Sequence, residues 1–404
     1  MAHDHDDMVW RGDAVETVLG MRESALAGQP TESVGIDGLS GRVLAERVLA
    51  EQDVPAHDFA TMDGYAFDAT DEYPLSLVEA DVYPEDDPPS LGEGEAVEIA
   101  TGATLPAEAS AVLKREEATV EDGHLSGPPL DPGTYTYERG SNVAEGELLF
   151  ERHERLSPKD ALLLGDLDHD SVPVREPFSV GIVATGTEIH EERQSDLDSP
   201  MLAGLVRSWG HDPTYEGSVP DEYDRVRDRV AALAEAHDVV LTTGGTSVGH
   251  KDYVLRVLRD LGEVHFHRVR IRPGKPIAAA TLSGMDATVF AIPGKPVGAH
   301  AITTLVARPF FTGRTDLPTI DATMARDVGL GPEGFEYVVP VVLDGETAMP
   351  MGHPDSPISV YAEQFDPSVL SSSTRASRAD GFVVTTDPLS EGGSVDVVPY
   401  PVVE

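Results

Sequence analysis

The 404-residue chain has no cysteine and few cations, with 29 lysines and arginines against 72 aspartates and glutamates and a formal net charge of −43. The lack of cysteine excludes disulfides, thiolate metal sites and a cysteine nucleophile. The negative charge disfavours binding to nucleic acid or to an anionic membrane. No run approaches the roughly 18 apolar residues that span a bilayer, and the acidic start Met1–Asp7 is unlike a signal peptide. We therefore expect a cytoplasmic protein without a nucleic-acid or membrane partner.

The acidic residues are spread along the whole chain, whereas lysine is rare. This distribution predicts a protein from a halophile, because screening at high salt makes a dense carboxylate surface tolerable. The charge therefore indicates habitat more than function. A local cluster of cations in such a chain is correspondingly more informative.

The spacing of apolar residues predicts an alternation of structures along the chain. Helical periodicity marks 8–27, 36–48, 156–167, 198–209, 222–237, 252–261 and 296–306. Short apolar runs between glycines and prolines predict β-rich regions at 55–149 and 319–404. Between these regions, buried strands at 178–185, 238–243 and 287–292 alternate with helices, which is typical of a parallel sheet covered on both faces.

The three buried strands end in polar, glycine-rich segments, Thr185–Glu188, Thr242–Asp252 and Pro293–Pro296. Ligands of open α/β sheets bind beyond the carboxyl ends of the strands. In the second segment, glycine amides and a following helix favour a phosphate or oxyanion, and Asp252 could hold a divalent cation. A tight turn with Asp252 as a helix cap explains that segment equally well. Glu188 is either a metal ligand or an exposed loop acid.

Three arginines, Arg268, Arg270 and Arg272, alternate with apolar residues. If this segment is extended, they share one face. Guanidinium groups pair with phosphate in a two-pronged geometry, so the stripe favours an anionic ligand. The alternative is that the arginines only neutralise nearby carboxylates. Lys275 follows in a rigid Pro-Gly-Lys-Pro turn near the same place.

Six motifs distributed over nearly the whole chain carry a resemblance to a known family. They are DFATMDGYA at 58–66, IATGATLP at 99–106, TGTE at 185–188, GGTSVGHKDY at 244–253, RPGKP at 272–276 and PGKPV at 293–297. In this order they resemble the molybdopterin molybdenumtransferase family, whose eukaryotic relatives include the gephyrin E region.

The resemblance implies an α/β plus β fold of four domains. These are a parallel-sheet molybdopterin-binding α/β domain (1–26 and 177–318), an elongated linking domain (27–50 and 145–176), an inserted β-rich domain (51–144) and a C-terminal β-barrel-like domain (319–404). It also implies a homodimer whose cleft combines the α/β domain of one subunit with the inserted domain of the other.

The implied reaction inserts molybdate into adenylylated molybdopterin and releases AMP and molybdenum cofactor, with Mg²⁺ assisting. A molybdopterin adenylyltransferase is a possible partner. The implied catalytic residues are Asp252, Glu188, Asp221, Asp63 and Thr101, of which Asp252 and Glu188 also hold the metal. The implied substrate-binding residues are Gly244, Gly245, Ser247, Arg268, Arg272, Lys275, Pro293 and Pro296.

The chain departs from the family pattern at several positions, among them Leu148, which follows Gly-Glu where an acid can occur. Lys295 replaces a usual Asn, Gly298 a usual Ser, Pro200 the Asn of a D-S-N motif, and Ser110 a usual Asp. These departures leave open a non-catalytic or tungsten-specific paralogue that binds molybdopterin. A molybdopterin adenylyltransferase is a third reading, because that enzyme resembles the α/β domain; the extra domains at 51–144 and 319–404 favour the molybdenumtransferase.

Overall fold

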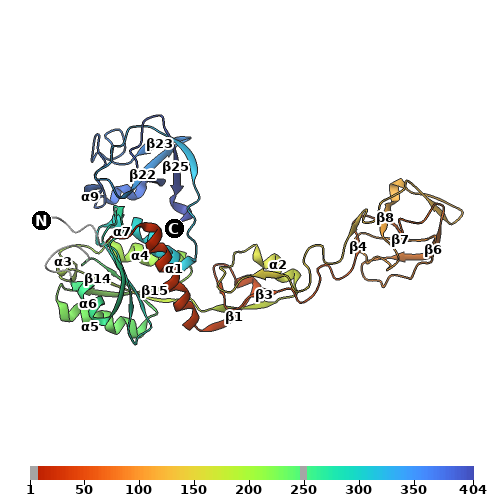
Figure 1. Cartoon of the computed structure of the whole chain (residues 1–404), viewed down its shortest axis with the longest axis horizontal. Coiled ribbons are helices and arrows are strands. Elements are labelled where there is room, and N and C mark those ends of the chain that lie inside the picture. The colour runs from red at the N-terminus through yellow and green to blue at the C-terminus, as the bar shows by residue number, and fades with distance from the viewer. Residues whose placement is uncertain (1–7, 246–252) are drawn as a thin grey trace. The chain divides into compact units, whose positions relative to one another are not determined.

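The computed structural model describes residues 8–245 and 253–404 (Figure 1). The chain divides into two compact units. The first comprises the described residues of Met1–Glu32, Gly41–Val43 and Val174–Glu404, and the second comprises Ser33–Ser40 and Leu44–Pro173. None of the helices in the described ranges has the length and apolarity needed to cross a lipid bilayer.

A six-stranded mixed sheet forms the centre of the first unit. Its strands, in spatial order, are β15 (Asp212–Val219), β14 (Ser179–Thr185), β16 (Val239–Thr243), β20 (Thr288–Ile292), β19 (Ala278–Leu282) and β17 (Gly262–His267). The first four run parallel. Strand β19 is antiparallel to β20, and β17 is antiparallel to β19 and so runs in the direction of the first four. The predicted parallel strands are confirmed as β14, β16 and β20, and they are adjacent. Strands β15 and β19 were not predicted, and the antiparallel edge makes the sheet mixed.

Helices cover both faces of this sheet (Figure 1). They are α1 (Arg11–Gly28), α3 (Thr187–His190), α4 (Asp198–Ser208), α5 (Tyr223–Ala236), α6 (Tyr253–Leu261), α7 (Pro296–Ile302) and α8 (Arg308–Thr312), with a π-helical turn at Thr303–Ala307 between the last two.

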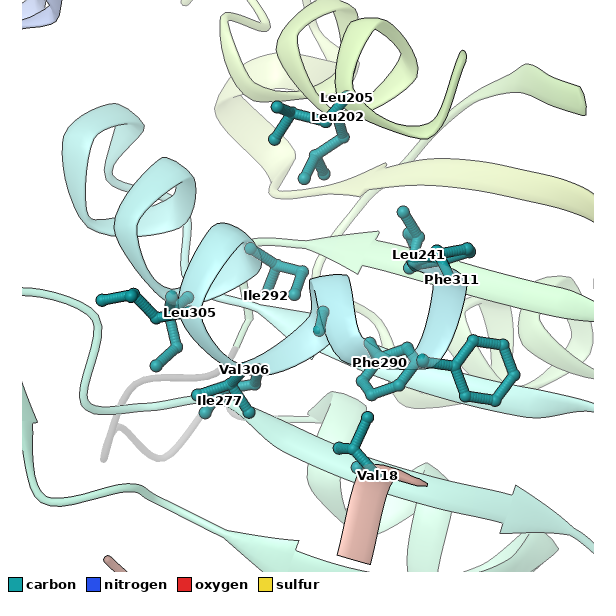
Figure 2. Packing of buried hydrophobic residues seen from close by; sticks show 14 of the residues in the cluster. Val18, Leu202, Leu205, Leu241, Ile277, Phe290, Ile292, Leu305, Val306 and Phe311 are labelled. Atoms are coloured by element: carbon teal, nitrogen blue, oxygen red, sulfur yellow. The ribbon is translucent and has the colours of Figure 1, made fainter. Parts of the chain in front are cut away.

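Neighbouring strand residues belong to two different cores. Leu241 and Phe290 pack with α1, α4 and α8, as Figure 2 shows. Val240 and Val289 pack with α5 and α6. Successive side chains of a strand point to opposite faces, so the continuous apolar runs in the sequence correspond to strands buried on both sides.

A closed β-barrel ends the first unit, as predicted. It contains β21 (Ile320–Met324), β22 (Glu336–Asp344), β23 (Thr347–Pro350), β24 (Gly381–Thr385) and β25 (Ser394–Pro399), and the pairing of β22 with β24 closes the ring. The short strand β18 (Ile271–Arg272) runs parallel to β22. Two short helical segments, α9 (Pro367–Leu370) and a 3₁₀ turn at Thr374–Arg378, lie between β23 and β24 in the chain.

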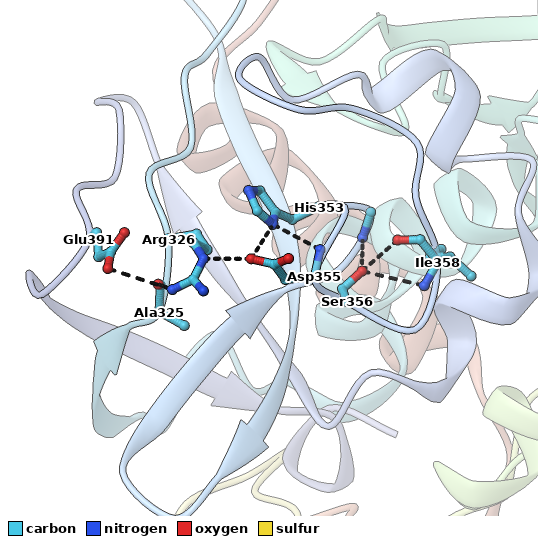
Figure 3. Close-up of polar contacts among 8 residues, drawn as sticks. Ala325, Arg326, His353, Asp355, Ser356, Ile358 and Glu391 are labelled. Atoms are coloured by element: carbon cyan, nitrogen blue, oxygen red, sulfur yellow. Dashed lines mark hydrogen bonds and ion pairs between the residues drawn. The ribbon is translucent and has the colours of Figure 1, made fainter.

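Arg326 on the barrel forms ion pairs with two nearby carboxylates, those of Asp355 and Glu391 (Figure 3). Arg326 Nε donates to Asp355 Oδ2 at 2.8 Å, and Arg326 Nη1 lies 3.6 Å from Glu391 Oε1. The arginine keeps the pKa of the Asp355 carboxyl below its ordinary value. This arrangement is an example of a cation that neutralises surface carboxylates.

The second unit is β-rich, as predicted. Its main sheet has the order β8 (Ala111–Lys114), β5 (Gly64–Phe67), β7 (Glu95–Ile99), β6 (Leu75–Val82), β10 (His124–Ser126) and β9 (Thr119–Glu121). Two short pairs join β11 (Thr136–Tyr137) to β4 (Phe59–Ala60) and β12 (Leu148–Phe150) to β3 (Val48–Leu49). Helix α2 spans Asp160–Asp166. Apart from this unit's own sheets, the chain contains a three-stranded sheet of the order β1 (Thr31–Gly35), β13 (Ser171–Arg175), β2 (Val43–Leu44).

The predicted helix at 36–48 is wrong. Only a 3₁₀ turn forms at Ile36–Gly38, and the strands β2 and β3 follow it. Glycines at 35, 38 and 41 raise the entropic cost of a helix here, and Gly41 adopts a φ of +79° that a right-handed helix does not use. The apolar residues instead serve short strands.

Candidate functional site

A cavity of about 380 Å³ lies at the carboxyl ends of β14, β16 and β20. Its lining combines glycines, two carboxylates, a lysine and residues of the barrel. The lining residues are Thr185, Gly186, Glu188, Ile189, Gln194, Asp221, Thr243, Gly244, Gly245, Gly274, Pro276, Pro293, Gly294, Lys295, Gly298 and Ser371. The three strand ends singled out by the sequence therefore meet at one hollow, where the parallel-sheet rule places ligands.

The glycines allow the strand-end loops to touch. The sequence suggested that the amide of Gly244 binds a phosphate or oxyanion. In the structure this amide instead donates to Ile292 O at 3.1 Å. A Cβ on Gly244 would lie 2.5 Å from Thr185 O, and its φ of +85° also disfavours a side chain. A Cβ on Gly294 would lie 3.0 Å from Gly244 Cα. Gly244 therefore serves close approach of the backbone.

Two carboxylates reach the cavity from neighbouring strands. Asp221 follows β15, and its Oδ2 accepts a bond from Thr187 N at 3.3 Å, while Asp221 N donates to Thr187 Oγ1 at 3.1 Å. Glu188 stands on the same short helix as Thr187, and its Oε1 lies 3.1 Å from the position of a Cβ on Gly186. The mutual bonds of Thr187 and Asp221 thus fix both acids beside the hollow.

The chemistry of these donors fits a magnesium ion. Carboxylate oxygens in small number, completed by water and substrate phosphate, are the usual surroundings of Mg²⁺. Asp252 and Ser247 lie outside the described residues. Within the described ranges, no group of three or more His, Cys, Asp or Glu is placed to hold a metal. The described part of the cavity therefore offers two candidate ligands, Glu188 and Asp221.

The arginine stripe is not a continuous strand face, and that prediction is wrong. Strand β17 ends at His267, and Arg268 takes a φ of +72°. Arg270 turns away, with its guanidinium 5.5 Å from the ring of Trp10. Arg272 belongs to β18, and its guanidinium lies 4.2 Å from the ring of Phe335.

Arg268, Arg272 and Lys275 nevertheless form a cation cluster. Burial lowers the pKa of the Lys275 ammonium, and the charges of Arg272 and Arg268 lower it further. None of the three makes an ion pair with a carboxylate in the described part of the chain. The cluster adjoins the cavity only through Gly274 and Pro276, which line it, whereas the three cations do not.

The two prolines of the third strand end separate. Pro293 lines the cavity, as predicted for a substrate-binding residue. Pro296 begins α7 and lines a neighbouring apolar cavity of about 370 Å³, together with Leu197, Met201 and His300. Pro296 therefore lies next to the candidate site rather than in its wall.

Asp63 and Thr101 belong to the second unit, and they contact each other. Thr101 N and Oγ1 donate to Asp63 Oδ1 at 2.7 and 2.8 Å. Both bonds lower the pKa of the Asp63 carboxyl, and the bond from the Thr101 backbone amide has the larger effect. The carboxylate is thus kept ionised and oriented on an exposed loop. Its predicted place in the cleft of a dimer stays a prediction.

Asp198, the first residue of α4, is a buried acid that contacts Thr243 of the cavity lining, and the sequence indicated only its place at the start of a helix. It is 6% exposed, and its Oδ2 accepts the hydroxyl of Thr243 at 2.9 Å. Its Oδ1 has no hydrogen-bond partner among the described residues. Burial raises the pKa of Asp198 to about 6; the bond from Thr243 opposes this rise and the nearby Asp196 adds to it. A carboxyl group that titrates near neutral pH therefore lies behind the cavity wall.

Ser371 was also missed. It comes from the segment after α9, and its carbonyl accepts Val297 N at 3.0 Å. Nothing near position 371 in the sequence indicates a site, because the proximity arises only from tertiary packing of the barrel segment against α7.

These features define a class: a multidomain protein with an α/β domain whose strand ends form a glycine-walled polar cavity, followed by a β-barrel. The family model described as "Probable molybdopterin binding domain" matches residues 181–313, and the model of the "MoeA N-terminal region (domain I and II)" matches residues 13–167.

Curated relatives and solved structures agree with these models. The chain is 31% identical to a molybdopterin biosynthesis protein of Methanocaldococcus jannaschii over 71% of this chain and 76% of that one. It is 30% identical to the molybdopterin molybdenumtransferase of Synechococcus elongatus over 74% and 77%. A crystal structure of the molybdopterin biosynthesis moeA protein from Pyrococcus horikoshii matches with a TM-score of 0.71 and 28% identity, over 97% of this chain and 99% of that one. The chain belongs to the molybdopterin molybdenumtransferase family.

Proposed function

We propose that this protein inserts molybdate into adenylylated molybdopterin, with release of AMP and molybdenum cofactor. Relatives of about 30% identity over most of their length are named for this transfer. The observation that carries the proposal is the meeting of three glycine-rich strand ends and two carboxylates at one cavity. A polyanionic substrate and an oxyanion need such a place, with close backbone approach and charge control.

The residues of the cavity divide the work. Gly244 lets the strand-end loops pack against each other, and Gly245 and Pro293 line the cavity where the phosphate groups would bind. The cluster of Arg268, Arg272 and Lys275 supplies positive potential behind that wall. A bound Mg²⁺ would neutralise phosphate oxygens, held by Glu188 and Asp252 with Asp221 beside them. These acids would also orient the water that attacks the adenylate phosphorus. The bond from that phosphorus to the bridging oxygen breaks, the molybdopterin phosphate keeps the bridging oxygen and takes up the proton of the water, and AMP carries the incoming oxygen.

The remaining parts of the assignment rest on the family. The four-domain division, the homodimer with Asp63 and Thr101 completing the partner's cleft, the contribution of Ser247, and delivery by a molybdopterin adenylyltransferase belong to the same proposal. So do a cytoplasmic location and adaptation to high salt, for which the net charge of −43 is the support.

A binding-only or tungsten-specific paralogue is the second candidate. It is favoured by the positions of Lys295 and Gly298, two departures from the family pattern that both line the cavity. Replacement of molybdate by tungstate in the assay below separates the two metals. Tight molybdopterin binding without turnover, unchanged in Asp252→Ala, would support a binding protein.

The test is AMP release from adenylylated molybdopterin by the purified full-length chain with molybdate and Mg²⁺, across a range of salt concentrations. We expect release that depends on molybdate, and at least a hundredfold loss of rate in Asp252→Ala, the order typical of a catalytic electrostatic group. Absence of AMP release at every salt concentration would refute the proposal. Consumption of ATP with unmodified molybdopterin would identify an adenylyltransferase instead.

A further inference from the structure

Lys295 occupies a distinctive place in the cavity. It lies between the end of β20 and the start of α7, and it is the only lysine or arginine among the described residues that line the hollow. The same lining includes Glu188 and Asp221. Two carboxylates without a bound cation would repel an anionic guest, and this ammonium group is the positive charge of the described lining that opposes them directly.

The present partner of Lys295 is a neutral one. Its Nζ donates to Ser368 O, on α9, at 2.9 Å. The same carbonyl accepts the hydroxyl of Ser371 at 3.1 Å. A carbonyl oxygen has two lone pairs, so Ser368 O remains hydrogen-bonded if Lys295 moves away. Breaking this contact therefore leaves no acceptor without a partner.

Lys295 also differs from the cations that neutralise carboxylates in this chain. Arg326 is held by Asp355 and Glu391 on the barrel (Figure 3). Lys295 makes no direct ion pair with a carboxylate of the described residues; its charge only adds to the hydrogen bonds from Ser368 and Val369 that lower the pKa of the Asp366 carboxyl. An ammonium group has three N–H donors, and one of them suffices for Ser368. At least two donors thus remain for a ligand, in a protein whose net charge leaves an abundance of carboxylates to pair with.

We propose that Lys295 is an anion-binding residue of this cavity, which holds a phosphate or oxyanion group of the substrate and rests on Ser368 O when the site is empty. The inference deepens the proposed function and rests on it. It also gives a role to a substitution that otherwise suggests loss of activity, because the lysine adds a charged donor where the family pattern has a neutral amide.

The contact is charge-assisted, so its removal should weaken binding by about 10- to 100-fold. A flexible lysine that contacts the ground state and transition state alike should raise KM with little change in kcat. The effect should shrink as salt rises, because part of it is Coulomb attraction.

The experiment compares Lys295→Met, Lys295→Arg and the matched control Lys159→Met in the full chain. Lys159 is an exposed lysine of the second unit, so its replacement changes net charge equally. Binding of AMP and, separately, of molybdate is measured by calorimetry at two salt concentrations, and thermal unfolding checks the fold of each variant.

We expect Lys295→Met to weaken binding of at least one anion tenfold or more and to flatten its salt dependence, Lys295→Arg to recover most of the affinity, and Lys159→Met to match the wild type. Binding of both anions by Lys295→Met within twofold of the wild type would overturn the inference. Kinetics distinguish this failure from that of the proposed function: AMP release by the wild type with unchanged KM in Lys295→Met refutes only the role of Lys295. Weakened anion binding in Lys295→Met, together with a wild type that releases no AMP, would refute only the transferase assignment.

Discussion

The two ends of the central sheet each carry a cavity, but of different chemistry. The cavity at the amino ends is larger, about 520 Å³ against about 380 Å³, and is lined partly by Gln29, Asp238 and Asp286. Asp238 Oδ2 there accepts Ser179 N and Ser179 Oγ, both at 2.7 Å, and lies 3.4 Å from Gln29 Nε2. Its carboxylate is thus engaged in holding the chain together. Volume alone does not mark a functional site.

Glycine content separates the two ends further. Six glycines line the cavity at the carboxyl ends, whereas Gly28 is the one glycine among the described residues lining the other. Glycines in a cavity wall let the backbone approach a ligand closely. Their conformational freedom costs stability, which contacts between the loops offset. The comparison therefore predicts that substitutions at the carboxyl ends affect activity, whereas those at the amino ends affect stability alone.

The largest effect is expected for Gly244→Ala, compared with Gly284→Ala near the amino ends. Both glycines have positive φ, +85° and +74°, but only a Cβ at Gly244 meets backbone, at 2.5 Å from Thr185 O. We expect Gly244→Ala to abolish AMP release and to lower the free energy of unfolding by about 3 kcal/mol. Gly284→Ala should cost about 1 kcal/mol and leave activity intact. Denaturant unfolding with the transfer assay measures both; similar losses in the two variants would contradict the comparison.

A carboxylate-to-amide pair gives the next effect. Glu188→Gln should reduce the rate of AMP release by about a hundredfold and change stability by less than about 0.5 kcal/mol, because Glu188 is exposed. Asp238→Asn should cost about 1–3 kcal/mol of stability by weakening its bonds to Ser179. The rate of AMP release by Asp238→Asn, measured below its unfolding temperature, should match that of the wild type. A reversed pattern would move the candidate site to the other end of the sheet.

The smallest effect on rate is expected at Asp198. Its pKa is about 6 in the fold and near 3.8 when unfolded, so between these values the folded protein binds more protons. Stability should therefore fall as pH rises from about 4 to 6, by at most about 3 kcal/mol. Asp198→Asn should remove this decline, whereas Asp344→Asn, an exposed control, should retain it. Unfolding curves at constant salt across this pH range are the measurement. A decline that persists in Asp198→Asn would show that burial of this carboxyl is not its source.

The sequence predicted the parallel core well because β14, β16 and β20 are largely apolar and each has a glycine within two residues of its end. The prediction from sequence failed where residues alternate as in a strand but the backbone does not stay extended. Alternating apolar residues around Arg268, Arg270 and Arg272 suggested one strand, but Arg268 adopts a positive φ and the chain passes to a second sheet.

Local sequence patterns could not predict contacts between residues that are far apart in the chain. Ser371 is 127 residues from Gly244, yet both line the cavity. Asp198 could be recognised as the start of a helix, but its burial depends on Thr243 and on the loops packed above it. The motifs identified which strand ends matter, whereas the distances among their side chains required the fold.

The short strand β18 links Arg272 to the β-barrel. By sequence it belongs to the α/β region, yet its backbone pairs with β22 of the barrel, and the amide of Glu336 donates to Arg270 O at 2.8 Å. Arg11 clamps the same Glu336 with two bonds of 3.0 Å. Hence a shortened protein ending before the barrel would retain almost every predicted ligand-contacting residue and still lose the scaffold that orients its guanidinium groups.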